Sequence, residues 1–416
     1  MPTIDLKYGR SVIPFEFAAG QFEILGHDEN KPSLSDAQIG EGFDKPIDSP
    51  LLEEIVSPGE SVLIVVPDAT RQTASGQIVN LVVRRLIANG TAPHDIRIIF
   101  ATGIHRKVTD EEKAAILTPF ILQRIKTLDH DPRDLMQITR LGETASGISA
   151  ELNRALAQHD RVIIIGGAMF HYFAGFTGGR KLICPGLASA KTVAATHKLA
   201  FDCEKKTRRD GVDTALLDGN AVNEAFMEIT AMIAPAFALT AITNDAGEAV
   251  DLYCGHWRTS HRAACDAYAA QHTITVKEKR DVVIASCGGY PFDVNMIQAH
   301  KALEAASHAC TDGGMIVLLA ECADGLGRDD FLNWFEADSS EQLAERLCAK
   351  YQVNGQTAWS LMRKTERFDI RIVTELDDAV AAKMGLRREA TSEIAKLTVG
   401  KHGYVLPYGA KFQISV

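Results

Sequence analysis

The chain lacks the features that mark several classes of protein. No apolar run approaches the roughly 20 residues of a membrane-spanning helix, and the amino terminus has no basic start followed by an apolar signal core. The 8 cysteines form no CxxC pair and have no zinc-site spacing, so reduced, buried thiols are expected. The net charge is -10, and no segment supplies the basic stripe that nucleic acids require. These absences predict a cytoplasmic protein that binds neither membrane nor nucleic acid, and they predict nothing about its oligomeric state.

The composition supplies enough apolar material for large cores, with 416 residues of which 46% are hydrophobic and 24% charged. Short apolar runs at 62–66, 95–102 and 162–165 are typical of buried parallel strands, and 77–89 has the pattern of a helix. Strands that alternate with helices indicate parallel sheets. The sequence therefore predicts an α/β fold of two domains with mainly parallel sheets and an active-site cleft between them.

The division into domains follows from a second run of strand and helix patterns that begins at Asp281. We expect an N-terminal domain, residues 1–275, that attaches a cofactor and carries catalysis. A C-terminal α/β domain, residues 276–401, is expected to contribute substrate contacts. The final residues, 402–416, are predicted to return to the N-terminal domain and complete it.

The most informative segment, 166–197, places Lys181 in a glycine-rich turn between His171 and His197. It begins at the end of a predicted strand, and open α/β sheets bind ligands at the carboxyl ends of their strands. Glycines let a backbone approach a ligand closely, and exposed amides in such a turn suit a phosphate group. The segment therefore predicts a ligand site in which a loop and a helix bring the three side chains together.

A phosphate-binding loop of the kinase type is the obvious alternative for this segment. That motif needs a glycine before its lysine and a serine or threonine after it, whereas Arg180 and Leu182 occupy those places. Magnesium-nucleotide chemistry would lack its hydroxyl ligand, and we set the kinase interpretation aside.

Three further segments place polar side chains where predicted strands end. Asp68 and Arg71 follow one strand, His105 follows the next, and Gln298 and Lys301 lie three residues apart on one face of a later helix. Taken singly, each fits a structural role as a turn former, a loop residue or a helix surface charge. Their repeated occurrence at the same kind of edge favours a functional site, because independent solvated charges have no reason to gather there.

Together these motifs resemble one family, the nickel-dependent lactate racemases. The resemblance covers nearly the whole chain through separated motifs in the same order: PDATR, ATGIH, FHYFAGFTGGRKLICPG, His197 and GGYPFDVNMIQAHK. It implies a nickel-pincer nucleotide (nickel pyridinium-3,5-bisthiocarboxylic acid mononucleotide) joined to Lys181 as a thioamide, with nickel coordinated by His197. In this family separate cofactor-biosynthesis proteins supply that group.

The resemblance also implies roles for the other candidate residues. His105 and His171 are implied to be the catalytic pair. The cofactor is implied to be held by Asp68, Ala69, Thr70 and Arg71, and the substrate to be bound by Arg71, Gln298 and Lys301.

The implied reaction is inversion at C2 of a 2-hydroxy acid. Removing a hydride and returning it to the other face avoids a carbanion at a weakly acidic position. One base on each face must take the hydroxyl proton as the hydride leaves, and imidazole suits both because its ordinary pKa of about 6.5 permits either protonation state near neutrality. His105 is expected to serve one enantiomer and His171 the other, while Arg71 and Lys301 hold the carboxylate.

One residue departs from the family pattern, since Ile297 stands where these racemases usually have a tyrosine. Loss of that phenol leaves a more apolar pocket, so the expected substrate is lactate or a more apolar 2-hydroxy acid. Two alternatives stay open. A nicotinamide-dependent hydroxy-acid dehydrogenase would also transfer hydride, although its GxGxxG fingerprint is absent from this chain. A homologue that binds the cofactor or a ligand without turnover would carry the same motifs.

Overall fold

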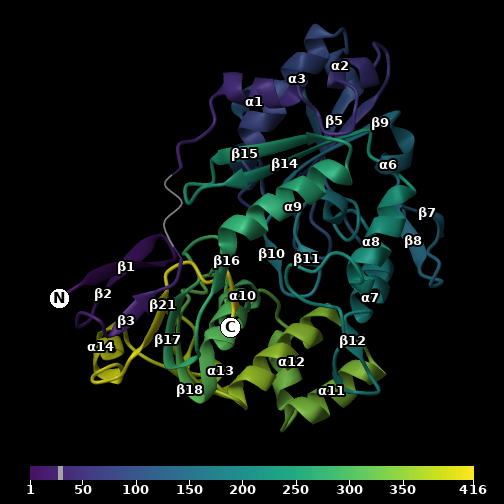
Figure 1. Cartoon of the computed structure of the whole chain (residues 1–416). Coiled ribbons are helices and arrows are strands. Elements are labelled where there is room, and N and C mark those ends of the chain that lie inside the picture. Colours follow the sequence, from purple (N-terminus) through teal and green to yellow (C-terminus); the bar gives the residue numbers. More distant parts are fainter. Residues whose placement is uncertain (27–30) are drawn as a thin grey trace. The chain divides into compact units, whose positions relative to one another are not determined.

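In the computed structural model, which describes residues 1–26 and 31–416, the chain forms two compact units (Figure 1). Each unit contains a six-stranded sheet whose strand pairs are mainly parallel. The predicted α/β class with two domains is therefore confirmed. Unit 1 comprises Met1–Asp28, Phe201–Arg209 and Gln271–Val416, and unit 2 comprises Glu29–Ala200 and Asp210–Ala270.

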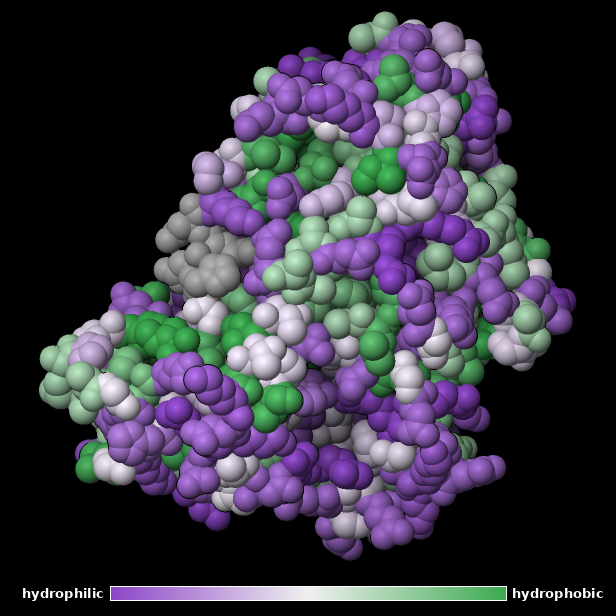
Figure 2. All heavy atoms as spheres, viewed as in Figure 1, coloured by the Kyte–Doolittle hydropathy of each residue, from purple (hydrophilic) through white to green (hydrophobic). Residues whose placement is uncertain are grey.

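The face of the molecule seen in Figure 2 is mostly hydrophilic, and hydrophobic residues appear on it in small groups. Within the described residues, none of the helices combines the length and the apolar character that crossing a membrane would take. The apolar residues are instead concentrated in the interiors of the two units.

The sheet of unit 2 has the strand order β15-β14-β9-β4-β5-β6 and is parallel except for the pair β14 and β15. Because β4 lies between β9 and β5, successive connections leave on opposite sides of it, which creates a switch point at its carboxyl end. Its strands are β4 (Val62–Pro67), β5 (Ile96–Ala101), β6 (Lys126–Leu128), β9 (Arg161–Gly167), β14 (Phe237–Thr243) and β15 (Ala249–Gly255).

The predicted strands and helix of this unit are confirmed. All six residues of β4 are buried, as expected of a parallel strand covered on both faces. The helix predicted at 77–89 is α3, Ser75–Ala88, which buries Ile78, Val82 and Leu86 along one face. The other helices are α1 (Asp36–Phe43), α2 (Leu52–Ile55), α4 (Asp110–Ile116), α5 (Pro119–Arg124), α6 (Ala155–Gln158), α7 (Ala190–Lys198), α8 (Ala221–Ala231), α9 (Thr259–His272) and the short turns η1 (Pro93–Asp95) and η2 (Gly179–Leu182).

Two small antiparallel hairpins complete unit 2. One is formed by β7 (Ile138–Glu143) and β8 (Ser149–Asn153), the other by β10 (Phe170–His171) and β11 (Gly175–Phe176). The second hairpin follows β9 directly and precedes η2. It therefore lies at the carboxyl edge of the sheet, in the segment that the sequence singled out.

The sheet of unit 1 is parallel throughout, with the order β20-β19-β18-β17-β21-β3. Its strands are β3 (Phe22–Ile24), β17 (Arg280–Ser286), β18 (Cys310–Leu319), β19 (Asp369–Val373), β20 (Arg387–Arg388) and β21 (Gly403–Leu406). Its helices are α10 (Met296–Ala309), α11 (Ser340–Ala349), α12 (Val353–Thr365), α13 (Asp378–Lys383), α14 (Ile394–Leu397), η3 (Phe331–Glu336) and η4 (Thr391–Glu393). Short pairs are formed by β1 (Thr3–Tyr8) with β2 (Ser11–Glu16), β12 (Phe201–Asp202) with β13 (Thr207–Arg208), and β16 (Thr273–Thr275) with β22 (Gln413–Ser415).

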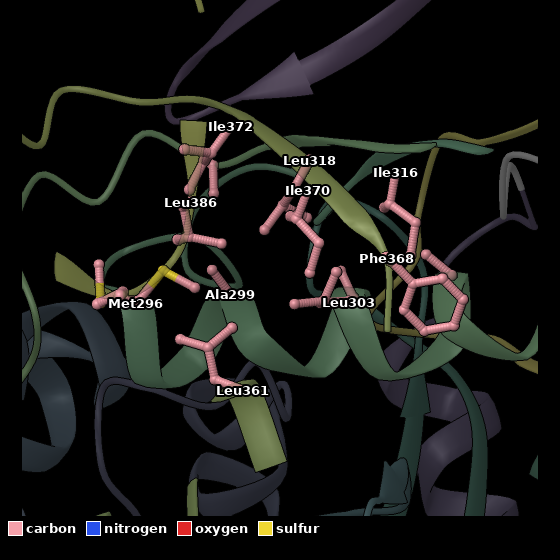
Figure 3. Close-up of a cluster of buried hydrophobic side chains, with 14 of the residues drawn as sticks. Met296, Ala299, Leu303, Ile316, Leu318, Leu361, Phe368, Ile370, Ile372 and Leu386 are labelled. Atoms are coloured by element: carbon pink, nitrogen blue, oxygen red, sulfur yellow. The ribbon is translucent and has the colours of Figure 1, made fainter. Parts of the chain in front are cut away.

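Helix α10 packs along one face of this sheet (Figure 3). Met296, Ala299 and Leu303 point from the helix toward Ile316 and Ile370 on the strands. All of these side chains are buried, so their hydrophobic contacts fix the orientation of α10 on its own sheet.

The division into units differs from the predicted domains at both ends of the chain. The strand β21 pairs with β17 and β3, so residues 402–416 lie in unit 1 together with the first 26 residues, and 201–209 joins them. The sequence placed all three segments in the N-terminal domain. Periodicity identifies a strand but not its partner, because any parallel edge can accept a short apolar strand.

The cysteines also differ from expectation. Cys203 and Cys348 form a disulfide within unit 1, with a Cα–Cα distance of 5.7 Å, whereas reduced thiols were predicted for all eight. The other cysteines of the described chain are free and buried, as expected. The two partners are 145 residues apart in sequence, and pairing at such a separation depends on the fold.

Candidate active site

Most of the predicted site residues lie in unit 2, in the segments that follow the carboxyl ends of β4, β5 and β9. These segments carry Asp68 with Arg71, then His105, and then the stretch that contains His171 and Lys181. The strands are adjacent and parallel, so their ends meet at one edge of the sheet. The segments that carry Asp68, His105 and Lys181 therefore lie at one edge of the unit 2 sheet, whereas Gln298 and Lys301 lie in unit 1.

The residue that directly holds His105 is Asp68. The Nδ1 atom of His105 lies 2.7 Å from Oδ2 of Asp68, whose other oxygen accepts hydrogen bonds from the amide (3.0 Å) and hydroxyl (2.6 Å) of Thr70. Burial by itself would raise the pKa of Asp68, but the charge and hydrogen bond of His105, with Arg71 and Thr70, hold it well below its usual range. The carboxylate therefore accepts the proton on Nδ1 and leaves the lone pair of the imidazole on Nε2.

The His105 side chain is 42% exposed, whereas its partner Asp68 is buried. The buried carboxylate of Asp68 therefore holds an imidazole that is open to solvent. Arg71 lies beside it and donates from Nη1 to the carbonyl (3.0 Å) and hydroxyl (3.2 Å) of Thr70. Burial lowers the pKa of Arg71 while Asp68 opposes the shift, and a guanidinium stays charged at neutral pH. The ends of the adjacent strands β4 and β5 thus hold a cation and an oriented base.

The second imidazole, His171, ends β10 and is held differently. The amide of Ala174 donates to Nδ1 of His171 at 3.3 Å, so Nδ1 is an acceptor and the proton of the neutral ring lies on Nε2. The ring stacks on Tyr172 and meets Phe173 edge to face, with centroids 5.5 and 4.5 Å apart. His171 is buried.

Lys181 lies in the short turn η2, which the preceding glycines make possible. Gly178 has φ +72 and ψ -171, and a Cβ built on it would lie 2.5 Å from the carbonyl oxygen of Gly167. Gly179 has φ +51, and its Cβ would lie 2.5 Å from the ring of His261. Neither position tolerates a side chain, because the turn presses against β9 and α9 to bring Lys181 into place.

His197, on α7, is the most deeply buried of the three candidate imidazoles. Its Nδ1 lies 2.8 Å from the carbonyl of Val193 one turn earlier, so Nδ1 carries the proton and Nε2 carries the lone pair. Burial, and next the charge of Lys181, lowers the pKa of His197 to about 3, although the bond to Val193 raises it. The ring is therefore neutral at pH 7, which is the form in which imidazole binds a metal.

Two aromatic rings connect Lys181 with His197. The Nζ of Lys181 lies 5.8 Å from the ring centroids of both Phe173 and Phe226, and the same two rings lie 5.2 and 5.5 Å from the ring of His197. The sequence did not single out Phe226. Its place in α8, between Val222 and Ile229, has the ordinary spacing of a helix core residue, so no signal distinguished it.

The described residues contain no group of three or more histidine, cysteine, aspartate or glutamate side chains arranged to hold a metal ion. His197, the metal ligand that the sequence predicted, therefore belongs to no such group among the described residues. A metal bound there would need its remaining donors from a non-protein ligand.

Gln298 and Lys301 lie together on α10 in unit 1. The Nζ of Lys301 donates to Oε1 of Gln298 at 2.6 Å, and the side chain of Asn295 caps the helix by accepting from the amide of Gln298 at 3.0 Å. Ile297, between them in sequence, is partly buried and packs against the core of unit 1. An apolar side chain at this position therefore has a packing role within its own unit.

Comparison with known proteins gives consistent matches along the chain. A family model described as the lactate racemase N-terminal domain matches residues 8–208, and one described as the lactate racemase C-terminal domain matches residues 275–399. The lactate racemase of Thermoanaerobacterium thermosaccharolyticum is 28% identical over 346 residues, covering 82% of this chain and 80% of that protein. The lactate racemase of Lactiplantibacillus plantarum is 28% identical over 352 residues, covering 83% and 81%.

A solved structure agrees with these sequence matches. The structure of the lactate racemase apoprotein from T. thermosaccharolyticum superposes with a TM-score of 0.89 at 25% identity and covers 100% of both chains. A Thermotoga maritima protein superposes with a TM-score of 0.72 at 18% identity over 92% of this chain, which is a likeness of fold alone.

Proposed function

We propose, from the premise that this chain belongs to the lactate racemase family, that it inverts the C2 centre of lactate or a related 2-hydroxy acid. The observation that carries the proposal is the pairing of Lys181 with His197 against the same two aromatic rings. A neutral imidazole can bind a metal, and a lysine beside it can carry a covalently attached cofactor.

The residues present fit a nickel-pincer nucleotide. Lys181 would be its covalent attachment, and Nε2 of His197 would complete the coordination of nickel, because Nδ1 is engaged by Val193. When bound, this group supplies an acceptor for the hydrogen at C2 of the substrate. The group would bring its own sulfur and carbon donors, so nickel would need few ligands from the protein.

The protein's own residues supply the proton transfers. The Nε2 atom of His105 is positioned to take the hydroxyl proton of one enantiomer, because Asp68 holds the proton of the ring on Nδ1. His171 is proposed to serve the other enantiomer. Because the Ala174 amide holds the proton of its neutral ring on Nε2, the ring must first change to the tautomer with a lone pair at Nε2. A carboxylate partner stabilises the imidazolium that forms on His105, so Asp68 acts in this proposal as a positioning residue for the base. Ala69 and Thr70 are proposed to lie beside the cofactor.

Cationic groups are proposed to bind the substrate carboxylate. Arg71 belongs to the same strand end as Asp68, and Lys301 with Gln298 forms a hydrogen-bonded pair on α10. The positive charges of Arg71 and Lys301 fit an anionic substrate, and a guanidinium can form bidentate hydrogen bonds with a carboxylate. Ile297 packs against the core of unit 1. Turnover of a panel of 2-hydroxy acids measures whether the protein prefers lactate or a more apolar substrate.

The experiment is to produce the protein together with cofactor-biosynthesis proteins, record its intact mass and follow lactate by chiral chromatography. We expect a mass increase that Lys181→Ala abolishes, and interconversion of L- and D-lactate. His105→Ala and His171→Ala are expected to keep the adduct and the nickel but lose racemisation. An adduct with no turnover on any 2-hydroxy acid tested would instead identify a cofactor-binding homologue, and normal turnover by either histidine variant would overturn the two-base scheme.

A further inference from the structure

Arg180, which precedes Lys181, is the largest of the fully buried side chains and is 1% exposed. Its Nε donates to Oδ1 of Asn223 on α8 at 2.7 Å, and its Nη2 donates to the carbonyl of Ala174 at 2.6 Å. Both acceptors are neutral. No carboxylate among residues 1–26 and 31–416 pairs with this guanidinium, and burial lowers the pKa of Arg180 to about 10.

The third contact of the guanidinium is with His261, whose Nε2 lies 3.4 Å from Nη1 of Arg180. The same nitrogen lies 2.8 Å from the carbonyl of Thr177. One imidazole nitrogen cannot both donate and accept, and the shorter distance assigns it as a donor to Thr177. The guanidinium of Arg180 therefore donates hydrogen bonds to the side chain of Asn223 and the carbonyl of Ala174.

A buried cation with only neutral partners is unfavourable, and an apolar side chain of similar volume would commonly pack there at lower cost. The position of the two acceptors indicates what the guanidinium does. Ala174 closes the turn between β10 and β11, and its own amide is the group that donates to Nδ1 of His171. The carbonyl and the amide of one residue thus connect Arg180 to the second imidazole.

We propose that Arg180 is a positioning residue for His171: it fixes Ala174 so that the Ala174 amide keeps the proton of the neutral imidazole on Nε2. His105 has the opposite tautomer, because Asp68 holds its proton on Nδ1. In the resting enzyme one ring then presents a lone pair and the other presents an N–H. The proposal rests on the proposed function only for the catalytic meaning of this difference.

Nitrogen-15 NMR of the full-length protein tests the proposal without cofactor or substrate. With histidine labelled at both ring nitrogens, two-bond proton–nitrogen correlations at pH 8 distinguish the two neutral tautomers. Signals are assigned by their loss in His171→Gln and His105→Gln. We expect the Nε2–H pattern for His171 and the Nδ1–H pattern for His105 in the wild type.

Substitution of Arg180 then tests its part. Arg180→Met removes both hydrogen bonds and should give His171 a mixture of tautomers, with His105 unchanged. Arg180→Lys keeps one donor for Ala174 and should preserve the wild-type pattern. The matched control is Thr230→Val, which removes the hydroxyl that donates to the backbone carbonyl of Arg180 at 3.1 Å but leaves the guanidinium in place. The His171 signals should not change in this control.

Two results would overturn the proposal: an Nδ1–H pattern for His171 in the wild type, which needs no variant to fold, or an unchanged Nε2–H pattern in folded Arg180→Met. Turnover separates this proposal from the proposed function. If the loaded wild type fails to racemise any 2-hydroxy acid, the function is at fault whatever the spectrum shows. If the loaded wild type racemises a 2-hydroxy acid and Arg180→Met has the same kcat and the same His171 tautomer, only the proposed role of Arg180 is contradicted.

Discussion

At the scale of single residues, three imidazoles of unit 2 differ in what their Nδ1 atoms contact. Those of His105 and His197 face a carboxylate and a carbonyl, whereas that of His171 faces an amide. The partners assign two rings a lone pair at Nε2 and the third an N–H. In the proposed function these rings are an oriented base, a neutral metal ligand and a second base whose resting tautomer presents an N–H.

The Asp68–His105 pair leads to the first residue-level prediction. Asp68→Asn keeps the size of the side chain but removes the charge that favours the imidazolium, so kcat should fall by roughly 10²–10⁴-fold. The Lys181 adduct should form normally, as intact mass will report. Thr70→Val, which removes one donor to Asp68, is the milder control. Loss of the adduct in Asp68→Asn would indicate that Asp68 holds the cofactor. A kcat equal to that of the wild type would contradict the proposed role of Asp68 in orienting His105.

At the scale of elements, the glycine turn before Lys181 joins β11 to η2 with almost no free space. Gly178 and Gly219 have nearly equal φ angles, +72 and +73, but a Cβ on Gly178 meets the Gly167 carbonyl while one on Gly219 meets nothing within 4 Å. The two positions share a positive φ, but Gly178 has in addition the steric contact and a ψ of -171, which essentially only glycine adopts. Gly219→Ala should lower the free energy of unfolding by about 1 kcal/mol. Gly178→Ala should lower it by a further ~1–3 kcal/mol.

Urea unfolding of both glycine variants, with adduct formation as a second measurement, checks this prediction. Gly178→Ala should also slow attachment at Lys181, since the turn must move to relieve the contact, whereas Gly219→Ala should load normally. Equal losses of stability in the two variants would show that the turn has room that the structure does not indicate.

The elements that could be predicted from sequence are those with strong periodicity. The runs ending at Val66, Ala101 and Ile165 became adjacent parallel strands, and α3 followed from its apolar face. The contacts between side chains could not be predicted. Asp68 and His105 are 37 residues apart in sequence, and no local pattern records that their side chains meet. The same holds for Phe226, which looks like any core residue of its helix.

At the scale of the whole molecule, the sequence predicted the fold class but not which segments share a unit. The segment 201–209 joins unit 1 through a disulfide and the ion pair of Arg208 with Glu304 at 2.7 Å. The strand β21 joins it through strand pairing on both of its sides. Each of these contacts requires the rest of the unit to be folded. Length and composition carry no information about them.

The buried histidines predict how the stability of the whole chain depends on pH. Burial is the main cause that lowers the pKa of His130 to about 4 and the pKa values of His197, His261 and His300 to about 3. Unfolded histidines titrate near 6.5, so between about pH 4 and 6.5 the unfolded chain binds more protons than the folded one. Stability should therefore be full above about pH 6.5 and fall as the pH drops.

Urea unfolding between pH 7.5 and 4.5 measures this dependence. Each group contributes at most about 1.4 kcal/mol per pH unit, and His130→Gln should reduce the slope by removing one of them. A free energy of unfolding that rises as the pH falls over this range would contradict the neutral state of these rings.

The most direct test of the central claim is the fate of deuterium during turnover. Lactate carrying deuterium at C2 is incubated in ordinary water with the loaded enzyme, and the enantiomer formed is analysed by chiral chromatography and mass spectrometry. Because His105 and His171 handle only the hydroxyl proton, the account predicts that the product of inverted configuration retains its deuterium. Replacement of that deuterium by hydrogen from the solvent would mean that a base removes the C2 hydrogen as a proton, and would contradict the account.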